Sequence, residues 1–277
     1  IPPSVSIIIY SVLAEQSIGQ MFLAGLLPGV LMGLALMVFV VILSYYKGFE
    51  YDGEFSLSEV VSSLRESALA LLTPLLVIGG ILSGVFTATE AGAIAVVYIA
   101  IIGSTVYGEL SFSDLYEEIQ NSMIETATLT FILAMASLYG LAALQLGVPT
   151  LLVQEFAGLT DNPTYLLLIL VFIFLIVGTF MDTIAAMTVL VPIVLPLLNA
   201  AGIDLVHFGI VMFIALLLGL LTPPFGIILF VMEKVTDASL EEVFRAVVPY
   251  YVPILVVLLL CIFVPEVVTY VPFETMG

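Results

Sequence analysis

Asp182 is the residue of this chain best suited to binding chemistry, because it places a carboxyl group in an otherwise apolar stretch. It lies in "GTFMDT", between the apolar runs 163–180 and 183–199, and no Lys or Arg lies nearby. An ionised carboxylate in hydrocarbon costs at least about 3 kcal/mol unless it is paired. A bound cation would supply the missing partner, and a proton on Asp182 would also remove the charge.

Oxygen atoms dominate the surroundings of Asp182 and indicate which cation would bind there. The hydroxyls of Thr179, Thr183 and Thr222, together with backbone carbonyls, are hard donors that suit a small hard cation rather than a soft metal. We therefore predict a sodium site, with Asp182, Thr179 and Thr222 as candidate ligands. A single cysteine, Cys261, and a single histidine, His207, leave little for thiol or zinc chemistry, so no cofactor beyond this coupling ion is expected.

Two proline pairs lie in similar stretches of the sequence. Pro2 and Pro3 in "IPPSVSIIIY" align with Pro223 and Pro224 in "LTPPFGIILFV", and the likeness continues downstream at a shift of 221 or 222 residues. Each pair removes backbone donors and should break a helix into two halves. Ser4 and Thr222 adjoin the pairs, where their hydroxyls would either satisfy freed carbonyls or coordinate an ion.

The composition places these features in a membrane. The 277 residues are 62% hydrophobic and 9% charged, with a mean hydropathy of +1.31, which indicates an integral membrane protein built of helices. A formal charge of −18 argues against nucleic acid or an anionic lipid surface as a partner, whereas the hydrophobic composition makes the lipid bilayer the expected surroundings. Since the sequence starts at Ile1 without Met, we expect a fragment or a processed chain.

Apolar runs predict the membrane spans, at 25–46, 67–86, 88–108, 120–143, 163–180, 183–199, 207–232 and 250–272. The few residues between 180 and 183 favour a re-entrant hairpin over 163–199, although two full spans remain possible. Capping-box patterns at Ser17, Ser56 and Ser239 predict short helices that lie along the membrane surface.

The basic residues predict the orientation. Lys47, Arg65, Lys234 and Arg245 lie in two loops separated by an even number of crossings, so both loops should be cytoplasmic. An even number of crossings also makes the two proline-pair copies antiparallel, which is an inverted repeat. We predict the end of a first repeat in 1–49, with half of a broken helix, an interfacial helix and one span. A second repeat in 50–277 contains the hairpin, a broken helix over 207–235 and a last span over 250–272.

Broken helices in inverted repeats mark the binding sites of transporters. The helix starts after Thr183 and Phe225 would attract an anion beside the cation. The sequence therefore predicts an all-α polytopic membrane protein that imports a carboxylate with sodium.

The chain resembles the large membrane subunit of TRAP transporters (DctM type) in "IPPSVSIIIY", "SIGQMFLAGLLPG", "GGILSGVFTATEAGAIAVVY", "GTFMDTIAAMTVLVPIVLPLL", "GIDLVHFGIVM" and "GLLTPPFGIILFV". The resemblance implies an elevator mechanism in the cytoplasmic (inner) membrane and a small membrane subunit as partner. It also implies an extracytoplasmic binding protein that delivers organic acids such as C4-dicarboxylates or sialic acids. The implied site joins the hairpin tip to the helix break, at Gly178, Thr179, Asp182, Thr183, Gly219, Thr222, Pro223, Pro224 and Gly226, with Ser4 in an equivalent first site. The family's N-terminal part, including a first hairpin, is absent from this sequence.

Three other functions remain as alternatives: a carrier for divalent anions that needs no binding protein, an intramembrane enzyme and a membrane scaffold. An enzyme would need a nucleophile with a base or a metal dyad, which the sequence does not provide, so we expect a non-enzyme. His207 is predicted to make a structural contact, and Thr87 with Glu90 to form a helix cap.

Overall fold

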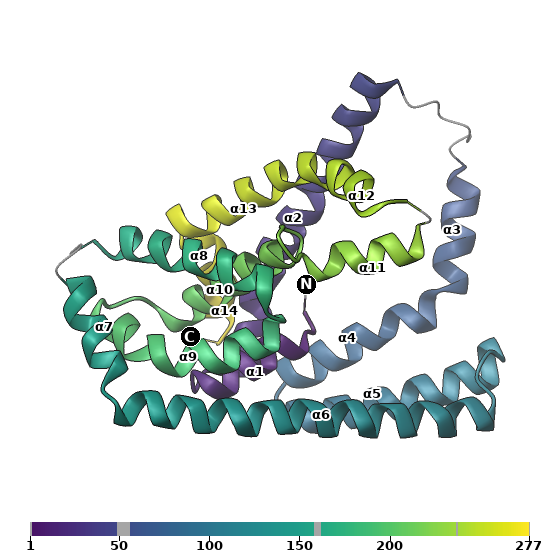
Figure 1. Cartoon of the computed structure of the whole chain (residues 1–277). Helices are drawn as coiled ribbons and strands as arrows, with labels where there is room; N and C mark the ends of the chain where they lie inside the picture. The colour runs from purple at the N-terminus through teal and green to yellow at the C-terminus, as the bar shows by residue number, and fades with distance from the viewer. Residues whose placement is uncertain (1, 49–55, 158–161, 237, 277) are drawn as a thin grey trace. The chain divides into compact units, whose positions relative to one another are not determined.

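The computed structural model describes residues 2–48, 56–157, 162–236 and 238–276, and all regular elements within these ranges are helical (Figure 1). Six continuous helical stretches in these ranges, two of them made of consecutive shorter helices, are long and apolar enough to cross a membrane. The predicted class, an all-α polytopic membrane protein, is therefore confirmed. In chain order the helices are α1 (Val5–Leu13), α2 (Ile18–Lys47), α3 (Leu57–Glu66), α4 (Ala68–Leu82), α5 (Ala88–Ile102), the π-helix η1 (Gly103–Tyr107), α6 (Phe112–Gln145), α7 (Val148–Ala157), α8 (Pro163–Phe180), α9 (Thr183–Ala200), α10 (Leu205–Leu220), α11 (Ile227–Val235), α12 (Leu240–Val247), the 3₁₀ turn η2 (Val248–Tyr250), α13 (Tyr251–Phe263) and α14 (Glu266–Met276).

The helices pack into two units. One comprises Pro3–Leu43 and Ile132–Gly277, and the other comprises Ser44–Phe131. This division follows side-chain packing, whereas the predicted division near residue 49 follows the internal repeat and stays a prediction. All predicted site residues lie in the first unit.

The core of the first unit forms where α1, α8, α9 and α10 meet. Helix α8 packs along α10, and α1 packs against both α9 and α10. Three fully buried rings join these helices, since Tyr10 lies 6.4 Å from Phe208, which lies 5.7 Å from Phe174. The Tyr10 hydroxyl also donates a 2.6 Å hydrogen bond to the Leu205 carbonyl. Aromatic packing thus fixes the helices that carry the predicted site.

The predicted broken helix is confirmed. Helix α10 ends at Leu220 and α11 begins at Ile227, with the cis Pro223–Pro224 peptide bond between them. Gly226 precedes α11 with φ +52°, a conformation that glycine adopts without strain. The predicted helical hairpin is also present, because α8 and α9 are joined through only Met181 and Asp182. Whether its tip lies inside the membrane stays a prediction.

Helix bounds repeat at the predicted shift. A shift of 222 residues carries Val5–Leu13 of α1 onto Ile227–Val235 of α11, and Ile18 at the start of α2 onto Leu240 at the start of α12. The first helix of each copy therefore begins and ends at matching positions, and the second begins at a matching position. Their inverted orientation in the membrane stays a prediction.

The second helix is much longer in the first copy, as α2, than in the second copy, as α12. The prediction of a short interfacial helix after Ser17 is therefore wrong. No separate interfacial helix forms after Ser17, because α2 continues unbroken to Lys47 with Pro28 inside it. Its first turns are apolar and largely buried, so no polar face holds them at the membrane surface.

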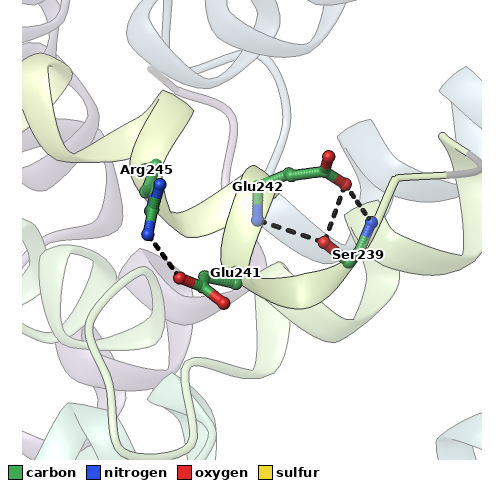
Figure 2. Close-up of polar contacts among 4 residues, drawn as sticks. All are labelled: Ser239, Glu241, Glu242 and Arg245. Atoms are coloured by element: carbon green, nitrogen blue, oxygen red, sulfur yellow. Dashed lines mark hydrogen bonds and ion pairs between the residues drawn. The ribbon is translucent and has the colours of Figure 1, made fainter.

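The α12 copy does form a short amphipathic helix, as predicted. Figure 2 shows its capping box, in which the Ser239 hydroxyl and backbone N–H both donate to Glu242 Oε2, at 2.7 and 2.9 Å. The Glu242 N–H donates to Ser239 Oγ in return at 3.4 Å, and Arg245 pairs with Glu241 at 2.6 Å. The Ser56 cap of α3 is present as well, with Ser56 Oγ accepting from the Glu59 N–H at 3.3 Å.

The last span differs from the predicted single helix over 250–272. Helix α13 ends at Phe263 and α14 begins at Glu266. Pro265 causes the break, because it has no N–H for the carbonyl of Cys261, four residues earlier. His207 supplies the donor instead, since its Nε2 lies 2.7 Å from that carbonyl and both groups are buried. A carbonyl can only accept, so Nε2 carries the hydrogen. The predicted contact role of His207 is thereby confirmed.

Replacing His207 with Ala should lower the stability of the fold. The Cys261 carbonyl would stay buried without a donor, at a cost of about 1–3 kcal/mol. Thermal unfolding of the purified protein should show the loss as a midpoint lowered by several degrees. His207→Gln retains an amide donor and should recover much of the loss; equal loss in both variants would contradict the role of the hydrogen bond.

The second unit contains α3, α4, α5, η1 and the beginning of α6. Two tyrosine hydroxyls donate to carbonyls on either side of the 60° bend between α3 and α4: Tyr107 to Glu66 at 2.9 Å and Tyr98 to Leu69 at 2.8 Å. Thr87 and Glu90 form the predicted capping box at the start of α5.

Candidate ion site at the hairpin tip

The tip of the α8–α9 hairpin presents the Asp182 carboxylate. Asp182 is the N-cap of α9, and its Oδ1 accepts a 2.8 Å hydrogen bond from the Ile184 N–H. A backbone N–H thus supplies one polar partner of the carboxylate, whereas the predicted cation stays a prediction. No basic side chain within the described ranges lies at ion-pair distance from Asp182. The carboxylate therefore lacks a cationic partner from those residues.

Two glycines bring the hairpin tip against the break after α10. A Cβ atom on Gly219 would lie 2.7 Å from both the Gly178 Cα and the Leu175 carbonyl oxygen, and one on Gly178 would lie 2.6 Å from the Leu216 carbonyl oxygen. Only glycine allows the two backbones to approach this closely. Beyond the contact, the rings of Phe180 and Phe225 lie 5.3 Å apart.

Three threonines lie in the hairpin and at the break, and they differ in how their hydroxyl hydrogens are used. Thr179 donates to the Ile176 carbonyl and Thr222 to the Leu218 carbonyl, each at 2.8 Å. Each hydroxyl has one hydrogen, so both retain only lone pairs for a further partner. The Leu218 carbonyl also accepts from the Leu221 N–H at 3.2 Å, so it is not one of the carbonyls that the proline pair frees. The hydrogen bond from Thr222 leaves the Thr222 oxygen able to bind a cation.

Thr183 has the most unusual environment of the three. It is 3% exposed, and its Oγ1 is the buried side-chain oxygen or nitrogen for which the described residues provide no hydrogen-bond partner. Leaving such an atom unpartnered costs about 1–3 kcal/mol. A cation in contact with this oxygen would remove that cost.

A cavity of about 520 Å³ opens beside the hairpin tip. Thr179, Thr222, Pro223, Pro224 and Tyr251 line it, with apolar side chains around them. The structure therefore brings Gly178, Thr179, Gly219, Thr222 and both prolines together, as expected from the sequence. Gly226 lies next to the Thr222 carbonyl oxygen, which would lie 3.3 Å from a Cβ atom there.

Ser4 lies outside this group. It is the N-cap of α1 without a side-chain capping bond, and within the described ranges no hydrogen bond joins it to the hairpin tip or to the α10 break. Its assignment to an equivalent first site stays a prediction.

Sequence reasoning missed Tyr251. Its hydroxyl donates a 2.5 Å hydrogen bond to the Leu221 carbonyl at the break. The only sequence signal was a tyrosine at the start of the last apolar run, which membrane helices often show for other reasons.

Comparison with known proteins identifies the family of this chain. The family described as "Tripartite ATP-independent periplasmic transporter, DctM component" matches residues 1–267. The chain belongs to this DctM family. The resemblance drawn from the quoted motifs is therefore confirmed, and the chain is a member of a family of membrane permeases.

Several members of the DctM family are similar over nearly the whole chain. The sialic acid TRAP transporter large permease protein SiaM of Vibrio cholerae is 37% identical over 100% of the chain, and the isethionate permease DctMQ of Oleidesulfovibrio alaskensis is 38% identical over 96%. The C4-dicarboxylate large permease DctM of Pseudomonas aeruginosa is 36% identical over 96%. The chain spans 65%, 42% and 62% of the lengths of these relatives, respectively. The substrates in their names differ, so family membership does not specify one.

Proposed function

We propose that this chain forms part of the large permease subunit of a sodium-coupled carrier that imports organic acids. The buried Thr183 hydroxyl carries this proposal, because it follows the Asp182 carboxylate directly and the residues that the structure describes offer it no hydrogen-bond partner. Together with the lone pairs of Thr179 and Thr222 it provides the oxygen-rich, anionic surroundings that a small hard cation prefers.

The remaining parts of the proposal rest on family membership. Relatives named as permeases for sialic acid, isethionate and C4-dicarboxylate support an organic acid as the substrate and transport, without catalysis, as the activity. The tripartite family description supports a small membrane subunit and an extracytoplasmic binding protein as partners. We place the protein in the cytoplasmic membrane, with Lys47, Arg65, Lys234 and Arg245 on the cytoplasmic side, and propose an elevator mechanism in which the hairpin and broken helix move together.

Sodium dependence of uptake tests the proposal. The complete carrier, with its small subunit and binding protein, should accumulate a labelled organic acid in liposomes under an inward sodium gradient. An equal potassium gradient should support no accumulation, because the site is selective for a small cation. If a proton gradient without sodium drives uptake equally well, the coupling ion is a proton, which neutralises Asp182 in place of sodium.

Omitting the binding protein from the same liposomes distinguishes the rival carrier. Uptake should fall to background without it. Full uptake in its absence would favour a carrier for divalent anions that takes substrate directly from solution.

A further inference from the structure

Carbonyl groups at the end of α10 need donors that the break removes. In a continuous helix the Gly219 and Leu220 carbonyls would accept from residues 223 and 224, but both of these are prolines without an N–H. The Gly219 carbonyl accepts from the Thr222 N–H at 2.8 Å instead. The Leu221 carbonyl accepts from Tyr251, a side chain of another helix.

These two hydrogen bonds act on one peptide group. The carbonyl between Leu221 and Thr222 is held by the Tyr251 hydroxyl, and the N–H of the same peptide is held by the Gly219 carbonyl. Because a peptide group is planar, holding both ends fixes the orientation of the whole plane. The backbone position from which the Thr222 side chain projects is thereby set.

Thr222 is then held by its side chain as well. Its hydroxyl hydrogen is used by the Leu218 carbonyl, so the oxygen keeps its lone pairs for another partner. Tyr251 lines the same cavity as Thr222 and Thr179. One tyrosine therefore holds the peptide that precedes a candidate cation ligand and lines the same cavity as that ligand.

We propose that Tyr251 is a positioning residue for the cation site, because it fixes the Leu221–Thr222 peptide and with it the Thr222 hydroxyl. This inference rests on the proposed sodium-coupled function. Tyr251 is the first residue of α13, so it also ties the start of that helix to the break in α10. Without its hydroxyl, the peptide should lose its fixed orientation, and sodium should bind more weakly.

The test compares Tyr251→Phe with Tyr250→Phe. Tyr250 is the neighbouring residue, and its ring packs 5.5 Å from Phe39, a contact that phenylalanine preserves. Thermal unfolding of the full chain with its membrane partner is measured in potassium buffer and then with increasing sodium. A ligand that binds only the folded state raises the midpoint as its concentration rises above its dissociation constant.

Tyr251→Phe should need roughly threefold to tenfold more sodium for half-maximal stabilisation, the factor expected for one lost hydrogen bond. The apparent sodium KM for uptake should rise by the same factor, with little change in the rate at saturating sodium. Tyr250→Phe should behave as the unmodified protein in both measurements.

A variant that unfolds earlier in potassium but keeps the normal sodium dependence would overturn the inference, since the hydroxyl would then only stabilise the fold. If sodium fails to stabilise the unmodified protein, the proposed function itself is wrong. The two failures are therefore distinguished by the unmodified protein alone.

Discussion

Replacing Asp182 with Asn should lower the apparent sodium affinity for uptake by roughly 10- to 100-fold, while the protein remains folded. Asn is as good an N-cap as Asp, so it can keep the 2.8 Å hydrogen bond from the Ile184 N–H at the start of α9. What it removes is the negative charge, and interactions with a charged partner contribute about 1.5–3 kcal/mol. The sodium concentration at half-maximal uptake in liposomes measures the effect.

Asp204→Asn is the matched control for this substitution. Asp204 is also an exposed helix N-cap, and its Oδ1 accepts from the His207 N–H at 2.8 Å at the start of α10. The same loss of charge at the same kind of cap should leave the sodium dependence unchanged. If both variants are impaired equally, the loss comes from general electrostatics or helix capping, and Asp182 holds no cation.

The parts of the fold that proline and glycine chemistry determines could be predicted from the sequence. The break over Pro223–Pro224 and the hairpin around Asp182 were expected because a proline pair and a two-residue connection between apolar runs allow few alternatives. The gathering of Thr179 and Thr222 around that break was also expected. The close contact of Gly178 with Gly219 is what makes it possible.

Other features depend on partners that are distant in the sequence. The apolar run 250–272 gave no sign of the break near Pro265, because a lone proline is often tolerated in a membrane helix, as Pro28 is in α2. Here a donor 54 positions away, His207, satisfies the freed carbonyl and allows the helix to end. Tyr251 was missed for the same reason, since its acceptor at Leu221 is set by tertiary packing.

Helix α7 was missed for a local reason. It occupies Val148–Ala157, between two predicted spans, where its ten residues are too few to cross a membrane. Gly147, with φ +71°, ends the preceding helix, and Pro149 lies in the first turn of α7. These stop and start signals lie in the sequence, but a pattern of apolar runs does not contain them.

Replacing Gly219 with Ala should both destabilise the protein and weaken the ion site. The added Cβ would lie 2.7 Å from the Gly178 Cα and from the Leu175 carbonyl oxygen, and backbone atoms cannot move aside as a flexible side chain can. Helices α8 and α10 must therefore separate, at a cost typical of overpacking, about 1–3 kcal/mol. The unfolding midpoint should fall by roughly 3–10 °C.

Gly33→Ala separates this clash from the general effect of removing a glycine. Gly33 lies within α2, and a Cβ there would meet nothing within 4 Å. Because alanine favours helix more than glycine by up to about 1 kcal/mol, the control should be as stable as the unmodified protein or slightly more so.

For Gly219→Ala, sodium should also stabilise the folded protein less, since the hairpin tip with Thr179 is pushed away from Thr222. A midpoint and a sodium response that match those of Gly33→Ala would show that α8 and α10 do not rely on this contact, and that the hairpin tip and the break do not form a common site.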